Sequence, residues 1–116
     1  MFKLNRKKVE TKEKKRKFGK DLDFASVEAY NLLRTNLYFS LADVAGGKVV
    51  GVTSPCPQEG KSTTSLNLAY ALAAAGHKVV LIDSDMRRPS LAAKLNLERI
   101  PGLSNYLAGR MLEKTL

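Results

Sequence analysis

The residues best suited to chemistry lie in a loop that ends in Gly60, Lys61 and Ser62, between a β-branched run and an Ala/Leu-rich segment. The triplet matches the second half of the phosphate-loop pattern G-x-x-x-x-G-K-[ST]. In such loops backbone N–H groups and the helix N-terminus attract an anion, and glycine lets the backbone approach it closely. We therefore expect Lys61 to neutralise the β- and γ-phosphates of a nucleotide and Ser62 to ligate Mg²⁺.

Proline stands where the pattern has its first glycine, at Pro55. Proline has no N–H and cannot donate a hydrogen bond to a phosphate, so the cradle must begin later in the loop. The residues predicted to bind the nucleotide are Gln58, Glu59, Gly60, Lys61, Ser62 and Thr63.

A second polar motif follows the apolar run 79–82, where Asp83 and Asp85 stand two residues apart and Arg87 comes next. Open α/β sheets bind ligands at the carboxyl ends of their strands, which is where both the loop and these carboxylates fall. Two carboxylates there can ligate Mg²⁺ and accept a proton from an attacking hydroxyl, and Arg87 can offset phosphate charge. The competing interpretation is that Asp83 only caps a turn.

The elements that must position these residues alternate in type. Two β-branched segments predict buried parallel strands, and the segment between them predicts a helix ended by a left-handed glycine. This is the parallel βαβ unit of α/β folds, so we expect an α/β fold of the P-loop type, a parallel sheet with flanking helices. Only two strands are visible, which indicates the first part of a larger domain. The predicted helices cover 24–41, 62–75, 89–95 and 103–108, and the predicted strands 49–52 and 79–83. The first helix is expected to have one apolar face, formed at helical spacing by Ala29, Leu32, Leu33, Leu37 and Leu41, and a cap at Asp23 or Ser26.

Charge is unevenly distributed along the 116 residues, whose net charge is +9. Residues 1–20 contain ten basic and two acidic residues, whereas the other 96 contain ten and nine. We expect residues 1–22 to be a disordered basic tail and 23–116 to be the N-terminal part of a P-loop domain. The tail can also bind an anionic membrane surface, while nucleic acid is disfavoured because it lacks aromatic residues for base stacking. A single cysteine and no apolar span favour a cytoplasmic protein.

Several motifs together resemble the bacterial tyrosine kinases encoded with capsule and exopolysaccharide genes. The segment 53–64 looks like their Walker A region, and 82–87 looks like their Walker A′ motif, an apolar run followed by D-x-D-x-R. Residues 28–36 are similar to the family's E-x-x-R-x-x-R-T-N element, and 88–91 and 101–109 also look like that family. The resemblance covers residues 25–110.

What the resemblance implies is ATP- and Mg²⁺-dependent autophosphorylation on tyrosine, at the inner face of the plasma membrane. Lys61, Asp83 and Asp85 would be catalytic, with Ser62 and both aspartates at the metal. The family also implies a homo-oligomer, with Glu28 and Arg34 at its interface, and a transmembrane polysaccharide co-polymerase as activator.

The chain departs from the family in three ways: Asn31 replaces the middle arginine of the oligomerisation element, and neither a Walker B motif nor a C-terminal tyrosine cluster occurs in the sequence. We therefore expect little kinase activity from these 116 residues alone. Two alternatives stay open. One is a MinD/ParA-type ATPase, disfavoured because Cys56 stands where those proteins have a signature lysine; the other is an inactive remnant that binds a membrane partner.

Overall fold

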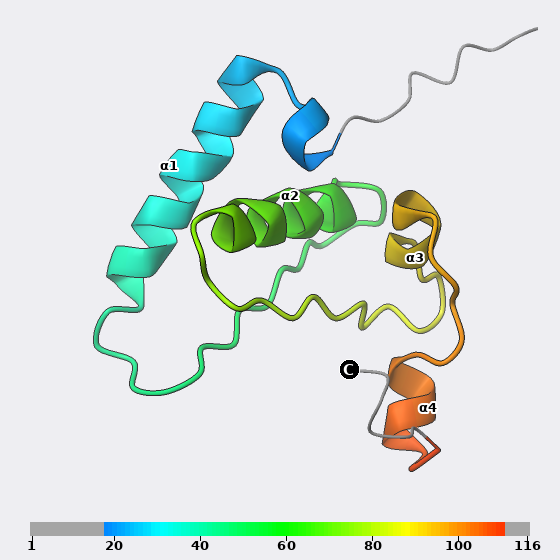
Figure 1. Cartoon of the computed structure of the whole chain (residues 1–116). Coiled ribbons are helices and arrows are strands. Elements are labelled where there is room, and N and C mark those ends of the chain that lie inside the picture. Colours follow the sequence, from blue (N-terminus) through cyan, green and yellow to red (C-terminus); the bar gives the residue numbers. More distant parts are fainter. Residues whose placement is uncertain (1–17, 111–116) are drawn as a thin grey trace, which may run out of the picture.

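The structure, a computed structural model, describes residues 18–110 as helices joined by extended segments (Figure 1). The expected helices are confirmed, with ends shifted by one or two residues. In chain order the elements are a 3₁₀ helix η1 (Gly19–Asp21), α1 (Phe24–Ser40), α2 (Lys61–Ala74), α3 (Leu91–Leu95) and α4 (Leu103–Leu107).

Helix α2 lies at the centre and supplies most of the buried side chains. Leu66, Leu68 and Ala71 are buried on it, and Leu91 of α3 is the other buried apolar residue among those described. The helix ends as predicted at Gly76, whose φ is +91°. The amides of residues 76 and 77 donate back to the carbonyls of residues 73 and 72, the bond pattern of a Schellman cap.

Helix α1 packs against α2 and is capped at its N-terminus by Asp23, whose carboxylate accepts a hydrogen bond from Ser26 N at 2.7 Å. The apolar face expected on this helix is only partly buried, since Leu32 is 63% exposed. The side chains that line the space between α1 and α2 include Val27 and Arg34 instead. Arg34 can lie there because its guanidinium donates to the Ala71 carbonyl at 3.1 Å, which satisfies a charge that burial alone would penalise.

A second contact joins η1 to α2. Asn67 of α2 is 1% exposed; its Oδ1 accepts from Gly19 N at 2.9 Å and its Nδ2 donates to Thr63 O at 3.0 Å. Residues 19–21 belong to the segment expected to be a disordered tail, but here they form a helical turn held against α2. The rest of that tail, residues 1–17, and the end of the chain, 111–116, lie outside the described residues.

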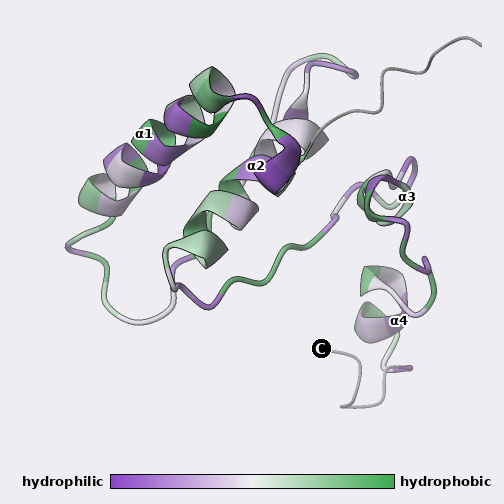
Figure 2. Cartoon of the chain, turned by 45° about the horizontal axis from the view of Figure 1, so that its top comes forward, coloured by the Kyte–Doolittle hydropathy of each residue, from purple (hydrophilic) through white to green (hydrophobic). Residues whose placement is uncertain are grey.

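The two predicted strands do not form a sheet within residues 18–110, where no strand is assigned. Both segments are extended, and Figure 2 shows hydrophobic residues along the one that follows α2. Val49 is 97% exposed and Val80 is 76% exposed. A strand is stabilised by hydrogen bonds to a neighbouring strand, and neither segment has such a neighbour in the described part of the chain.

The chain beyond the second extended segment forms two five-residue helices, α3 and α4 (Figure 1). Within the described region, none of the helices has the length and apolar character needed to cross a membrane. Helix α3 matters for the site, because its first turn lies beside the start of α2.

Candidate nucleotide-binding site

The loop before α2 contains two residues with left-handed backbone. Gln58 and Gly60 both have positive φ, of 61° and 86°, while the residues that follow are helical. The Gly60 carbonyl accepts the first helical hydrogen bond, from Thr64 N at 2.8 Å. Left-handed residues leading into a helix are the arrangement in which successive amides form an anion-binding concavity.

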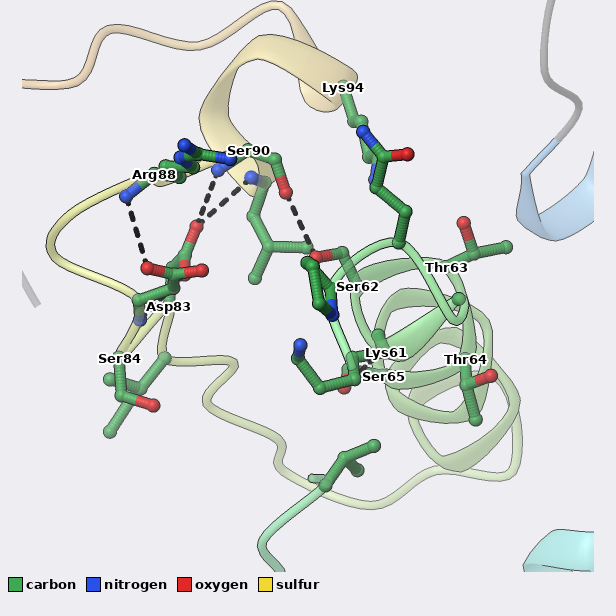
Figure 3. Close-up of a pocket in the computed structure, with 17 residues that line it drawn as sticks. Lys61, Ser62, Thr63, Thr64, Ser65, Asp83, Ser84, Arg88, Ser90 and Lys94 are labelled. Atoms are coloured by element: carbon green, nitrogen blue, oxygen red, sulfur yellow. Dashed lines mark hydrogen bonds between the residues drawn. The ribbon is translucent and has the colours of Figure 1, made fainter. Parts of the chain in front are cut away.

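This turn forms one wall of an open cavity of about 760 Å³ (Figure 3). That volume falls within the usual range for small-molecule sites. The loop and α2 contribute Pro57, Gln58, Gly60, Lys61, Ser62, Thr63, Thr64 and Ser65 to the lining. Of the six residues predicted to bind the nucleotide, five therefore line the cavity, and Glu59 is exposed outside it.

The opposite wall contains both aspartates of the second motif. Figure 3 shows Asp83 and Ser84 on the side of the cavity opposite Lys61 and Ser62, and Asp85 also lines it. The segments 58–65 and 82–85 thus meet at one site, as the strand-end argument predicts, although the strands themselves are not formed.

The two carboxylates differ in how much they are already bonded. Asp83 Oδ2 accepts from Ser90 N at 3.0 Å and from Leu91 N at 3.1 Å, and its Oδ1 accepts from Asp85 N at 3.1 Å. Asp85 accepts one hydrogen bond, through Oδ1 from Arg88 N at 3.0 Å. A carboxylate offers about four lone-pair positions, so Asp83 has about one left and Asp85 about three. Asp83 therefore caps the turn into α3 and also faces the cavity.

Sequence reasoning missed six polar residues in the lining: Thr64, Ser65, Ser84, Arg88, Ser90 and Lys94. Arg87, which we expected to offset phosphate charge, is exposed and does not line the cavity, whereas its neighbour Arg88 does. Adjacent residues in an extended loop point in different directions, and the D-x-D-x-R pattern does not show which arginine faces inward. The proline before Ser90 marks the start of α3, but no sequence signal places that serine next to the phosphate loop.

The residues present suit Mg²⁺ better than a metal held by protein ligands alone. Within residues 18–110, no three His, Cys, Asp or Glu side chains are grouped closely enough to hold a metal ion. Mg²⁺ is usually held by one or two carboxylates together with substrate phosphates and waters. Ser62, Asp83 and Asp85 line the cavity and offer this oxygen set.

The two residues expected at an oligomer interface lie away from this cavity, on α1. Glu28 is exposed. Arg34 is half-buried and bonded within the chain, to Ala71 O and, at 3.3 Å, to Asn31 Oδ1. Asn31, which replaces an arginine of the family pattern, thus accepts a hydrogen bond from Arg34, the second arginine of that pattern.

The chain is similar to several curated proteins, each over a limited part of their length. It is 46% identical over 80 residues to the tyrosine-protein kinase YwqD of Bacillus subtilis, covering 69% of this chain and 33% of that protein. It is 41% identical over 102 residues to the tyrosine-protein kinase CpsD of Streptococcus pneumoniae serotype 4, covering 87% and 42%. It is 43% identical over 83 residues to the tyrosine-protein kinase CpsD of Streptococcus agalactiae, covering 71% of this chain and 35% of that protein.

This chain therefore spans roughly a third to two fifths of the length of these relatives. These names confirm the resemblance to bacterial tyrosine kinases that the sequence motifs indicated. No solved structure matches the chain.

A family model for nucleotide-binding domains matches residues 50–108, a range that contains both walls of the cavity. The match confirms the expected P-loop class, while the parallel sheet expected with it is not among the described elements. The chain belongs to the CobQ/CobB/MinD/ParA nucleotide-binding domain family.

Proposed function

We propose that the chain is the nucleotide-binding part of an ATP-dependent protein-tyrosine autokinase that regulates capsular or exopolysaccharide biosynthesis. The observation that carries the proposal is the single cavity lined by Lys61 and Ser62 on one side and by Asp83 and Asp85 on the other. A phosphoryl-transfer site needs cations for the phosphates, oxygen ligands for Mg²⁺ and a carboxylate near the attacking hydroxyl, and this lining offers all three.

In this proposal Lys61 and the amides around Gly60 hold the β- and γ-phosphates of ATP. Ser62 and the carboxylates provide oxygen ligands for Mg²⁺, which would neutralise charge on the transferred group. Asp85 is the better candidate for the base, since Asp83 is largely occupied by backbone N–H groups. The base takes the tyrosine proton, the tyrosine oxygen bonds to the γ-phosphorus, and the bond from that phosphorus to the β–γ bridging oxygen breaks to release ADP.

The sheet belongs to the same proposal. The apolar segments 49–52 and 79–83 are already extended, and they lead directly into the two motifs. We expect them to become parallel strands when further strands lie beside them, which would bury side chains such as Val49 and Val80. The match to a P-loop family supports this reading.

The remaining expectations about partners and place are also proposals. The resemblance to tyrosine kinases supports a homo-oligomer and a transmembrane polysaccharide co-polymerase as activator. The basic tail supports contact with an anionic membrane at the cytoplasmic face. Residues 1–22 as tail and 23–116 as the start of the kinase domain remain the proposed division, with η1 as an anchored end of the tail.

The test compares Lys61→Ala with Arg87→Ala in the full-length protein. Both remove one cation, but only Lys61 lines the cavity. A hydrogen bond to a charged group contributes about 1.5–3 kcal/mol, so Lys61→Ala should weaken MgADP binding by about 10- to 100-fold, and Arg87→Ala by less than about twofold.

The reaction is followed with γ-labelled ATP. Label transferred to protein tyrosine in the wild type and lost in Lys61→Ala supports the kinase. Release of inorganic phosphate without labelled tyrosine would instead favour a partitioning-type ATPase of the same family. A wild-type protein that binds no adenine nucleotide would overturn both.

A further inference from the structure

Two serine hydroxyls from distant parts of the chain meet at the edge of the cavity. Ser62 Oγ, in the first turn of α2, lies 2.9 Å from Ser90 Oγ, which precedes α3 (Figure 3). Both side chains are half-buried, and both line the cavity. Ser62 is the residue proposed above to ligate Mg²⁺, and its hydroxyl has one specific neighbour, the hydroxyl of Ser90.

Ser90 occupies the N-cap position of α3, but its hydroxyl does not cap that helix. An N-cap serine normally accepts a hydrogen bond from an amide in the first turn, yet Ser90 makes no side-chain cap hydrogen bond. Asp83 supplies acceptors for that helix end instead, bonding the amides of Ser90 and Leu91. The hydroxyl of Ser90 is thereby left to interact across the cavity with Ser62.

The position of Ser90 is set by its backbone and not by its own side chain. Ser90 N is held by Asp83 Oδ2 at 3.0 Å, and Asp83 is fixed in turn through Asp85 N at 3.1 Å. Removing the Ser90 hydroxyl therefore leaves the N–H bond that anchors the residue in place, so the role of the hydroxyl can be tested apart from the fold of the loop.

A serine hydroxyl has one proton to donate and two lone pairs. When one lone pair ligates a cation, the proton needs an acceptor, and its direction fixes where the lone pair points. Among the described residues Ser90 Oγ is the only hydrogen-bond partner of the Ser62 hydroxyl, and neither Asp83 nor Asp85 bonds to it.

We propose that Ser90 is a positioning residue for the metal–nucleotide complex: its oxygen accepts the proton of Ser62 and aims the free lone pair of Ser62 at Mg²⁺. This inference rests on the proposed function, since it requires Mg²⁺ and a nucleotide in the cavity. Groups that orient a metal ligand from behind typically contribute 10- to 100-fold to metal affinity. Ser90 thus acts on the metal through Ser62, without contacting it.

The test uses the full-length protein with Ser90→Ala, Ser90→Thr and, as a matched control, Ser104→Ala, an exposed serine of α4 outside the cavity. ADP binding is measured calorimetrically with chelator and over a Mg²⁺ titration at fixed ADP. We expect Ser90→Ala to raise the Mg²⁺ concentration at half-effect by about tenfold and to change metal-free ADP affinity by less than about twofold. Ser90→Thr keeps a hydroxyl and should stay close to the wild type, as should Ser104→Ala.

Four outcomes would overturn the inference. An unchanged Mg²⁺ titration in Ser90→Ala removes the role of the hydroxyl. Equal weakening with and without Mg²⁺ makes the residue structural, and faster exchange of the Leu91 amide would identify the disturbed loop as the cause. A wild-type protein that binds no ADP in either condition refutes the proposed function itself, and the inference falls with it, whereas normal ADP binding without any response to Mg²⁺ refutes the inference alone.

Discussion

Replacing Asn67 by alanine should release η1 from α2, because this side chain holds the two together. Asn67 is 1% exposed, and its Oδ1 accepts from Gly19 N at 2.9 Å. Gly19 is itself buried, so its N–H would be left without a partner away from water. A buried donor that loses its acceptor costs about 1–3 kcal/mol, and the lost donor to Thr63 O adds to this.

We take about 2–3 kcal/mol as the loss at this contact, which corresponds to an increase of about 30- to 150-fold in the local opening equilibrium. The assay is hydrogen exchange at the Gly19 amide, which reports on this opening directly. The matched control is Asn36→Ala on the exposed side of α1, where the Asn36 side chain makes no hydrogen bond among residues 18–110. Alanine is favoured in helices, so the control should not destabilise.

A second substitution reaches the same contact by another route. Gly19 has a φ of +57°, and a Cβ added there would lie 2.8 Å from the ring of Tyr70. Gly19→Ala should therefore detach η1 as well, through strain and a clash. If the Gly19 amide in Asn67→Ala exchanged within about twofold of the wild type, the buried hydrogen bond would not be what holds η1, and the magnitude argued above would be refuted.

Two further substitutions test the loop and the packing of α1. Gly60→Ala places a side chain at φ +86° with open space around its Cβ, so the cost of the substitution is conformational, about 1–2 kcal/mol. The MgADP affinity measured by calorimetry should therefore fall about 5- to 30-fold. An unchanged affinity would show that the loop binds the nucleotide in another conformation. Arg34→Met keeps the length of the stem but loses the hydrogen bond to Ala71 O, a carbonyl that still accepts from Ala75 N. Urea unfolding should therefore show a loss of about 1 kcal/mol with MgADP affinity unchanged, and a loss of affinity would contradict this placement of Arg34.

The sequence predicted best what local chemistry determines. The order glycine, lysine and serine before an Ala/Leu-rich segment predicted a helix from residue 62, one residue after the observed start of α2 at Lys61. Gly76 predicted its end, because left-handed backbone is needed at that cap. The helix α1 followed from its apolar spacing and from the cap at Asp23. These features depend on residues close together in the chain.

The face that α1 turns to α2 was predicted less well, because it depends on which partner is available. Leucines at helical spacing predict a buried stripe, but Leu32 is 63% exposed while Arg34 is half-buried. An arginine can be buried along its stem when its head finds a carbonyl, as it does at Ala71. Binary patterning counts arginine as exposed and cannot anticipate a specific acceptor 37 residues away.

At the site, too, the sequence could not predict which acceptor a donor would find, and this affects the role of Asp83 in the second polar motif. Asp83 was predicted to serve the metal, with a turn cap as the competing reading; the structure gives this carboxylate three backbone bonds and a place on the cavity wall together. The two interpretations are therefore compatible. Asp83 accepts the hydrogen bond from Ser90 N that fixes the backbone of Ser90, and the hydroxyl of Ser90 contacts the hydroxyl of Ser62. Spacing along the chain predicts which residues gather at a strand end. It does not predict that the Asp83 carboxylate accepts a hydrogen bond from the main chain of Ser90, seven residues further on. Within the loop 83–90, Asp83 thus fixes the backbone beside the site, while Asp85 accepts one hydrogen bond among the described residues and is the carboxylate that the proposed function assigns to the base.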